Sequence, residues 1–226
     1  MNRNETKRQI NFSNPFEWFD GVFCVNLDKR TDRWAHATKQ ADQYGFADKL
    51  MRYSAIENKD NPSRGNHFSH ANILEISKIE QFKNVLIFED DCEFLLMPSE
   101  VKLYLSLAIE QLPEDWHMLY LGCNMDQYYA YQTNNNLAKL KGCFSTHAYA
   151  INHTLFNKLI DINRSPETVH NDVAYANLVH PNYNCYAVVP MLAGQLEGVS
   201  DIEKRRVSYN SMLLERFEGH LIRWQK

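Results

Sequence analysis

The side chains best suited to chemistry in this sequence are three consecutive carboxylates, Glu89-Asp90-Asp91, which directly follow the apolar run Val85-Leu-Ile-Phe88. Neighbouring carboxylates repel one another, and a divalent cation relieves that repulsion. Side chains alternate along an extended segment, so we expect Glu89 and Asp91 on one side and Asp90 on the other. Oxygen ligands suit Mg²⁺ or Mn²⁺. The position at a strand's carboxyl end favours this metal site over the alternative, a solvated acidic turn followed by Glu93.

A pair of arginines, Arg30 and Arg33, follows the first apolar run of the chain. Three residues apart at a helix start, they can face the same way, and two guanidinium groups near a metal suit a diphosphate. Ion pairs with Asp28 and Asp32 on a solvated turn are the alternative, and taken alone the arginines favour it because surface ion pairs are common. The chain has no GxGxxG or Walker-type glycine pattern, so neither an ordinary dinucleotide site nor a P-loop is indicated.

Alternating strands and helices would position these residues. The alternation predicts one α/β domain over residues 1–226, with a mostly parallel central sheet flanked by helices and ligands outside the carboxyl ends of its strands. Residues 1–16 are expected to form a polar arm, and residues 126–137 a long loop. Apolar runs predict strands over 21–27, 51–56, 85–88, 117–121 and 184–189, and one strand or a small hairpin over 142–151. Apolar spacing near 3.6 residues and helix-end signals predict helices over 33–44, 71–81, 99–111, 154–162 and 171–179.

Two of these helices have recognisable end signals. Thr31 is expected to cap the helix over 33–44, and Gly45 suits its C-terminal end. Ser69 is expected to cap the helix over 71–81.

Composition limits the classes of partner and compartment. The 226 residues carry a net charge of −4, which argues against binding a nucleic acid polymer. No apolar run approaches the roughly 20 residues of a membrane-spanning helix, and the polar start lacks the apolar region of a signal peptide. Five cysteines without a CxxC pattern predict buried, reduced thiols, and together these features suggest a cytoplasmic enzyme of a bacterium or a virus. The cysteines are Cys24, Cys92, Cys123, Cys143 and Cys185.

Three segments, in their order and spacing, resemble glycosyltransferase family 25, which includes lipooligosaccharide β-galactosyltransferases and has the collagen galactosyltransferases as relatives. They read VNLDKRTDR at 25–33, GNHFSH at 65–70 and LIFEDDCEF at 86–94, with a looser match at Gln195 and Asp201. The resemblance covers roughly residues 20–205. It implies a GT-A-type fold, a UDP-sugar donor, Mn²⁺ or Mg²⁺, and inversion at the anomeric carbon. The implied reaction transfers a hexose, galactose or glucose, to a hydroxyl of a glycan or glycoconjugate such as lipopolysaccharide.

The resemblance also assigns roles to individual residues. The acidic run matches the family's DxD-like motif, which makes Asp91 the first metal ligand and Glu89 a ligand of the metal or the ribose. Asp201 is a further ligand of the metal or diphosphate, with a helix cap at Ser200 as the alternative. The residues expected on the donor side are Asn26, Arg30, Arg33, Ser69, His70, Glu89 and Asp90.

Inversion needs a base that takes the proton of the acceptor hydroxyl. Asp172 lies where the family carries an acidic residue ahead of a helix, and it is the first choice. His170 is the second, because its ordinary pKa suits proton transfer near neutrality. Without the resemblance, a helix cap with an acidic first turn would explain this segment.

Other functions remain open from sequence. A non-catalytic module that binds sugar nucleotides or glycans would keep the two arginines but would not need Asp172. A hydrolase with paired carboxylates would not explain the arginines or the adjacency of three acids. In the predicted loop, Tyr128, Tyr129 and Tyr131 either line an acceptor groove or pack on the flank of the domain.

Overall fold

The computed structural model describes residues 10–125, 130–168, 170–199 and 206–207. Its centre is an eight-stranded sheet in the order β2-β1-β3-β8-β5-β9-β7-β6. The strands are β1 (Gly21–Asn26), β2 (Leu50–Ser54), β3 (Asn84–Glu89), β5 (Met118–Met125), β6 (Ala130–Asn134), β7 (Leu137–Leu140), β8 (Cys143–Asn152) and β9 (Cys185–Val188).

Strand directions make the sheet mixed. β1 pairs in parallel with β2 and β3, and β5 pairs in parallel with β9. β8 is antiparallel to both of its neighbours, β3 and β5, and β7 is antiparallel to β9 and β6. Within this sheet six strands run one way and only β7 and β8 oppose them, so the predicted α/β architecture is confirmed.

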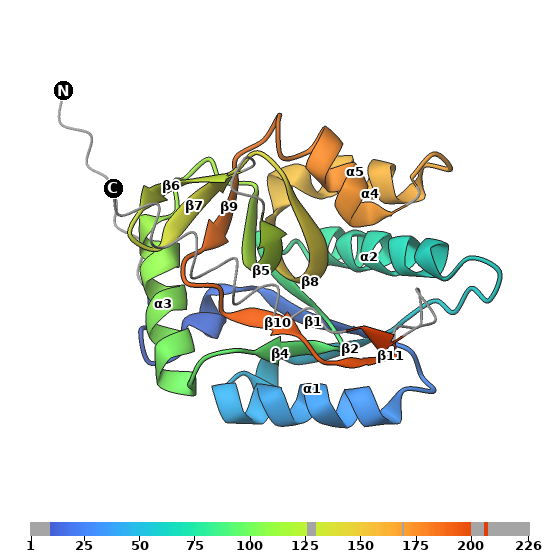
Figure 1. Cartoon of the computed structure of the whole chain (residues 1–226), viewed down its shortest axis with the longest axis horizontal. Coiled ribbons are helices and arrows are strands. Elements are labelled where there is room, and N and C mark those ends of the chain that lie inside the picture. Colours follow the sequence, from blue (N-terminus) through green and yellow to red (C-terminus); the bar gives the residue numbers. More distant parts are fainter. Residues whose placement is uncertain (1–9, 126–129, 169, 200–205, 208–226) are drawn as a thin grey trace.

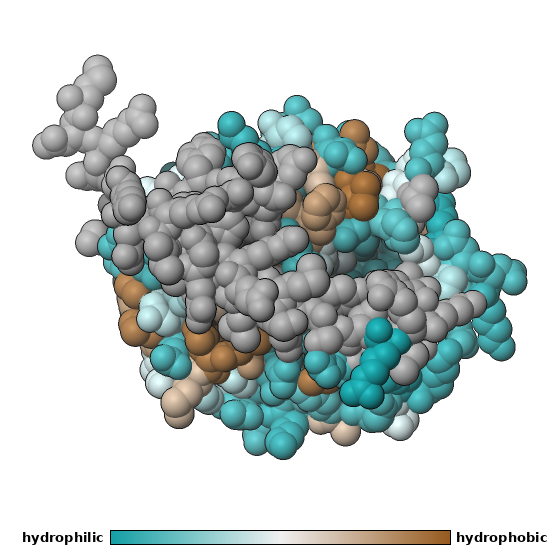
Figure 2. Space-filling model, in the orientation of Figure 1, coloured by the Kyte–Doolittle hydropathy of each residue, from teal (hydrophilic) through white to brown (hydrophobic). Residues whose placement is uncertain are grey.

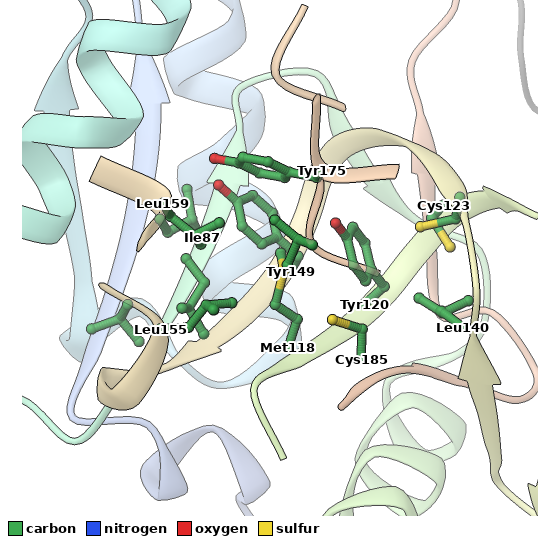
Figure 3. Close-up of a cluster of buried hydrophobic side chains, with 14 of the residues drawn as sticks. Ile87, Met118, Tyr120, Cys123, Leu140, Tyr149, Leu155, Leu159, Tyr175 and Cys185 are labelled. Carbon is green, nitrogen blue, oxygen red and sulfur yellow. The ribbon is translucent and has the colours of Figure 1, made fainter. Parts of the chain in front are cut away.

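Helices cover both faces of the sheet (Figure 1). α1 (Thr31–Tyr44) and α3 (Pro98–Gln111) pack on one face, and α2 (Pro62–Ile79), α4 (Phe156–Arg164) and α5 (Asn171–Leu178) pack on the other. Successive side chains of β3 point to opposite faces of the sheet, so this strand contributes residues to two separate hydrophobic cores. Val85 and Ile87 face the α2 side, whereas Leu86 and Phe88 face the α1 side. The α2-side core holds three fully buried tyrosine rings, Tyr120, Tyr149 and Tyr175 (Figure 3).

The ends of α1 follow from its sequence. Gly45 adopts a left-handed conformation with φ 82°, and its N–H bonds to the carbonyl of Ala41, as expected of a C-terminal glycine. At the other end Arg30, rather than the expected Thr31, is the N-cap residue, and no side chain caps that end.

α2 begins earlier than the apolar periodicity indicates. Its first turns are polar, with Asn61 as the cap and Pro62 as the first residue, so the prediction of a helix starting after Ser69 was wrong. Ser69 lies inside the helix and is buried. The segment escaped the prediction because the residues that it buries before Ile73 are mostly polar.

The predicted loop over residues 126–137 is also partly wrong, since β6 and β7 form a hairpin there. Two smaller pairs were not predicted: β4 (Cys92–Phe94) with β10 (Ala193–Gln195), and β11 (Gly198–Val199) with β12 (Arg206–Val207). Of the expected N-terminal arm, residues 1–9 lie outside the described residues. Pro15 and Phe16 are buried in a 3₁₀ helix (Pro15–Trp18), so they belong to the packed domain.

All five cysteines are buried and unpaired, which confirms the prediction of buried thiols. Burial raises the pKa of the Cys185 thiol to about 12. Within the described ranges, no helix combines the length and the apolar character needed to cross a bilayer.

Candidate functional site

The site residues gather where β1 and β3 end. β1 ends at Asn26 and β3 ends at Glu89, two parallel strands side by side. β8 runs the opposite way, so its beginning, near Thr146, lies at the same edge. This is the edge at which open α/β sheets bind ligands. The acidic run therefore lies where its position after a strong strand predicted.

The α1 side of the site is a charge cluster around Arg33. Its Nη1 atom lies 2.9 Å from Oδ1 of Asp90 and 3.4 Å from Oδ2 of Asp91. The Arg33 side chain is only 12% exposed, so these contacts are poorly screened by water. Glu89 and Asp90 point to opposite sides as expected, but the chain turns after Glu89 and Asp91 also reaches Arg33. The prediction that Asp91 would lie on the side of Glu89, opposite Asp90, was therefore wrong.

Asn26 acts as a connector within this cluster. Its side-chain Nδ2 donates to Oδ2 of Asp90 at 2.7 Å, and its Oδ1 accepts from Nε and Nη2 of Arg52 at 2.9 and 2.7 Å. Asn26 is 1% exposed. The amide is thus committed to protein partners and positions Asp90 rather than facing a ligand directly.

The two predicted arginines separate. Arg30 bonds to Asp32 at 2.9 Å on the exposed turn, and this hydrogen bond lowers the pKa of Asp32 to about 2. This contact is the surface pair that the sequence offered as the alternative. Arg33, in contrast, turns inward to the acidic run.

Burial and mutual repulsion shift the pKa values of the carboxyl groups in the acidic run. Burial, and next the charge of Glu89, raise the pKa of Asp91 from an ordinary 3.8 to about 7, although Arg33 opposes them. Burial also raises the pKa of Asp90 despite its bonds to Asn26 and Arg33. Asp90 and Asp91 share the guanidinium of Arg33, and with the neighbouring Glu89 the run carries more negative than positive charge, which a cation would offset.

Glu89 occupies the α2 side of the site. Its Oε1 accepts from Thr146 Oγ1 at 2.8 Å and Asn66 Nδ2 at 3.3 Å, and lies 3.5 Å from His70 Nε2. Burial acts to raise its pKa, but the neighbouring His70 ring and the hydrogen bond from Thr146 prevail and hold the pKa of Glu89 at about 2. Glu89 therefore stays ionised beside an Asp91 that resists ionisation.

Ser69 supports the fold of this region. Its Oγ accepts from Ile56 N at 2.9 Å and donates to Gly65 O at 2.8 Å. A Cβ at Gly65 would lie 2.2 Å from Ile56 O, so only glycine allows the preceding loop to approach α2 this closely. The Ser69 hydrogen bond to Ile56 and the close approach at Gly65 together hold the loop that contains Ile56 against α2.

The two candidate bases lie at the N-terminus of α5. Asp172 is partly buried, and its Oδ2 accepts from Ser145 N at 3.0 Å while its Oδ1 accepts from Val173 N at 2.8 Å. His170 is exposed, and its Nδ1 lies 3.0 Å from Ser63 Oγ. The side chain of Asp172 is thus oriented by backbone donors, one of them on β8.

An irregularity in β8 produces that contact. Between the pairs Gly122↔Ala148 and Asn124↔Phe144, two steps along β5 correspond to four along β8. Ser145, inside the bulge, has a φ of 74°. Bulges re-aim neighbouring groups, and here the bulge directs Ser145 N toward α5.

Some predicted residues lie outside the described part of the chain. They include Asp201, Ser200, Tyr128 and Tyr129, and the side chain of Tyr131 is not described either. Among the described residues, no three His, Cys, Asp or Glu side chains gather in a way that could hold a metal ion. Asp91 Oδ1 is nevertheless buried without a hydrogen-bond partner, while a side-chain hydrogen bond from Gln195, the other residue of the looser family match, also reaches Asp91. A divalent ion could be held here by one or two carboxylates together with oxygens of a substrate.

Sequence reasoning missed the partners that tie the site together. Arg52 lies within a predicted strand, Thr146 within another, and Asn66 before the predicted start of a helix. The available sequence signal for Arg52 was its charge, because it lies within the predicted apolar strand over 51–56. Nothing in the sequence indicated Thr146, because its role depends on β8 pairing beside β3.

On the face shown in Figure 2, hydrophilic side chains dominate over α1 and α2, and apolar ones gather over α3 and over α5. Val173 and Leu178 of α5 are 41% and 50% exposed. The exposed surface of α5 beside Asp172 is therefore partly apolar.

No protein-family model and no curated protein sequence matches the chain. A crystal structure of a glycosyltransferase involved in glycosylation of the major capsid of PBCV-1 is similar, with a TM-score of 0.51 and 8% identity over 74% of this chain and 80% of that one. A cytidylyltransferase from Leptospira borgpetersenii matches with a TM-score of 0.44 and 13% identity, over 74% of each chain. The apo form of UDP-glucose pyrophosphorylase matches with 0.43 and 10%, over 90% of this chain and 82% of that one.

Only the first likeness is strong enough for an argument. It shows that this chain and that glycosyltransferase share an α/β fold. Membership of glycosyltransferase family 25 stays a prediction.

Proposed function

We propose that the chain is a metal-dependent, inverting glycosyltransferase that moves a hexose, galactose or glucose, from a UDP-sugar to a hydroxyl of a glycan or glycoconjugate. One observation carries the proposal: a crowded acidic run with an unpartnered carboxylate oxygen on Asp91 lies at the ligand-binding edge of the sheet. The fold shared with a solved glycosyltransferase supports it.

In this mechanism Asp91, with Glu89 and Asp201, would hold Mn²⁺ or Mg²⁺ against the diphosphate of the donor. When bound, the cation supplies charge stabilisation to the leaving nucleoside diphosphate. Arg33 contributes positive charge beside the run, since its contacts with Asp90 and Asp91 hold it at this edge. Asn26 keeps Asp90 in place for that role.

Asp172 is the proposed base. Its carboxylate accepts backbone N–H groups from Ser145 and Val173, which fixes its orientation and leaves lone pairs for the proton of an acceptor hydroxyl. His170 is the second candidate. The exposed apolar side chains of α5 beside Asp172 suit an acceptor with an apolar face.

The first experiment measures thermal stability with Mn²⁺ and UDP, alone and together. We expect stabilisation only with both, and its loss with EDTA. Turnover is then measured with UDP-galactose and UDP-glucose, with UDP as the expected product. Asp91→Asn should lose the Mn²⁺-dependent stabilisation, whereas the exposed control Asp42→Asn should keep it.

A second variant separates catalysis from binding. Asp172→Asn should keep the stabilisation by Mn²⁺ and UDP while turnover falls by about 10²–10⁴-fold, the usual contribution of a general base. Retained turnover would transfer the role to His170 or to another group. Binding without turnover in the wild-type protein, toward every acceptor tested, would favour the non-catalytic module instead.

A further inference from the structure

Two buried side chains beside the site carry polar atoms for which the described fold provides no hydrogen-bond partner. His67 of α2 is 1% exposed, and neither Nδ1 nor Nε2 of its ring has a partner. Asn171, the first residue of α5, is 5% exposed, and its Nδ2 has none. Buried polar groups are usually paired, because an unpaired one destabilises the fold. Two such side chains at one place therefore indicate that a ligand supplies the missing partners.

The two side chains lie on elements that contact each other. Ser63 Oγ of α2 lies 3.0 Å from Nδ1 of His170, the residue before α5. His67 follows Ser63 by four residues, one turn along the same face of α2, and Asn171 directly follows His170. The unpartnered atoms thus flank a single contact between α2 and the start of α5.

The chemistry of these atoms suits hydroxyl groups better than phosphate. Burial, and next the charges of neighbouring basic side chains, lower the pKa of His67 to about 4, so near pH 7 its uncharged ring offers one donor and one acceptor. Asn171 adds an uncharged donor, because its Oδ1 already accepts from Asp172 N at 3.0 Å. The arginine of α2, Arg64, bonds to backbone carbonyls around the end of α4. A sugar hydroxyl both donates and accepts, so it matches this set of groups.

The position of His67 indicates which sugar it contacts. In a displacement with inversion, the leaving diphosphate and the base lie on opposite faces of the transferred hexose, so the hexose lies between the acidic run and the base. Three residues after His67 on α2, the ring of His70 approaches Glu89 within 3.5 Å. In the other direction α2 contacts the residue before α5, and the first turn of α5 holds Asp172. His67 therefore lies between the two parts of the site.

We propose that His67 and Asn171 bind hydroxyl groups of the transferred hexose and thereby distinguish a UDP-sugar from UDP. The identity of the ligand rests on the proposed function, in which neither residue has a role. Asn66 and Phe68 beside His67 are partly exposed, and His170 is exposed, so both side chains lie directly beneath the surface. Binding requires only that the side chains above them move, which is a common adjustment at binding surfaces.

The stability of the ligand-free protein tests whether the imidazole of His67 is unpaired. His67→Leu exchanges the ring for an apolar side chain of similar volume, so we expect the melting temperature to stay unchanged or to rise by up to about 4 °C. His180→Leu is the matched control, because this buried ring contacts the Tyr120 hydroxyl at 3.0 Å and accepts from Cys143 N at 3.2 Å. Its melting temperature should fall. A fall in His67→Leu as well would overturn the proposal, since it would mean that the ring is paired within the fold.

Calorimetry with Mn²⁺ then compares the binding of UDP with that of UDP-galactose and UDP-glucose. In His67→Leu we expect the affinity for the UDP-sugar to fall roughly tenfold, as the loss of about one hydrogen bond predicts. The affinity for UDP, the internal control, should change less than about twofold. Asn171→Ala should give the same pattern, and it provides a second variant should His67→Leu fail to fold.

The outcomes separate this inference from the proposed function. A wild type that binds UDP and a UDP-sugar, with variants that bind the UDP-sugar equally well, would overturn the inference and leave the proposed function standing. Equal losses for UDP and the UDP-sugar would also overturn it, because the two side chains would then act on the whole site. A wild type that binds neither ligand would contradict the proposed function, and with it the hexose as the ligand of these side chains.

Discussion

Replacing Asp91 by asparagine should stabilise the protein at neutral pH when no metal or nucleotide is added. The Asp91 side chain is 17% exposed, and the charges of Glu89 and Asp90 both act on it. Burial, and next the charge of Glu89, raise its pKa from 3.8 to about 7. Between these two values the folded protein binds a proton that the unfolded chain does not bind, so the free energy of unfolding falls as the pH rises through this window.

The magnitude follows from the same two values. Each pKa unit corresponds to about 1.4 kcal/mol, so the carboxylate costs the folded state up to about 4 kcal/mol above pH 7. Asparagine has nearly the same shape and no charge, so it removes this cost. It also removes the attraction to Arg33 at 3.4 Å, and we therefore expect a net gain of about 1–3 kcal/mol. Below about pH 4 aspartate is protonated in both states, and the gain should vanish.

Urea unfolding at about pH 4, pH 5.5 and pH 8 measures this dependence. Asp42→Asn on the exposed face of α1 is the control, with an expected change within about 0.5 kcal/mol at every pH. A gain in Asp91→Asn that does not depend on pH, or a loss of stability at pH 8, would refute the reasoning. Either result would mean that the carboxylate is well accommodated in the fold and needs no cation.

Three further substitutions test the surroundings of the site. Arg33→Met should lower the free energy of unfolding by roughly 2–4 kcal/mol at pH 8, measured in urea, and by less at pH 5, because protonation of Asp91, whose pKa is about 7, removes part of the orphaned charge. Gly122→Ala should destabilise by at least about 3 kcal/mol in the same assay, since its Cβ would lie 1.9 Å from the carbonyl oxygen of Ala193. Ser69→Ala should cost about 1–2 kcal/mol through two lost hydrogen bonds, but it should leave UDP affinity, measured by calorimetry, nearly unchanged.

The place of the site could be predicted because it depends on local pattern. An apolar run at 85–88 bounded by charge fixes a buried strand, and the carboxylates after it must then lie at the strand's carboxyl end. Gly45 likewise marks the end of α1 through its own backbone preference.

The partners within the site depend on long-range pairing, which local pattern does not encode. Thr146 reaches Glu89 only because β8 inserts between β3 and β5 in the opposite direction. The early turns of α2 carry buried polar side chains such as His67, so they showed no apolar period. Arg30 and Arg33 looked equivalent in sequence, and only the packing of α1 distinguishes the inward side chain from the exposed pair.

The bulge in β8 makes chain length, as well as residue type, a determinant of this site. From Tyr149 onward β8 is held in register by both β3 and β5, whereas its register with β5 shifts twice between Phe144 and Tyr149. An insertion or deletion confined to this stretch would swing Thr146 away from Glu89 and Ser145 away from Asp172, and the sheet behind them would keep its pairing. A change of chain length in this irregular part of β8 could therefore alter the contacts of both Glu89 and Asp172, while the rest of the sheet stays as it is.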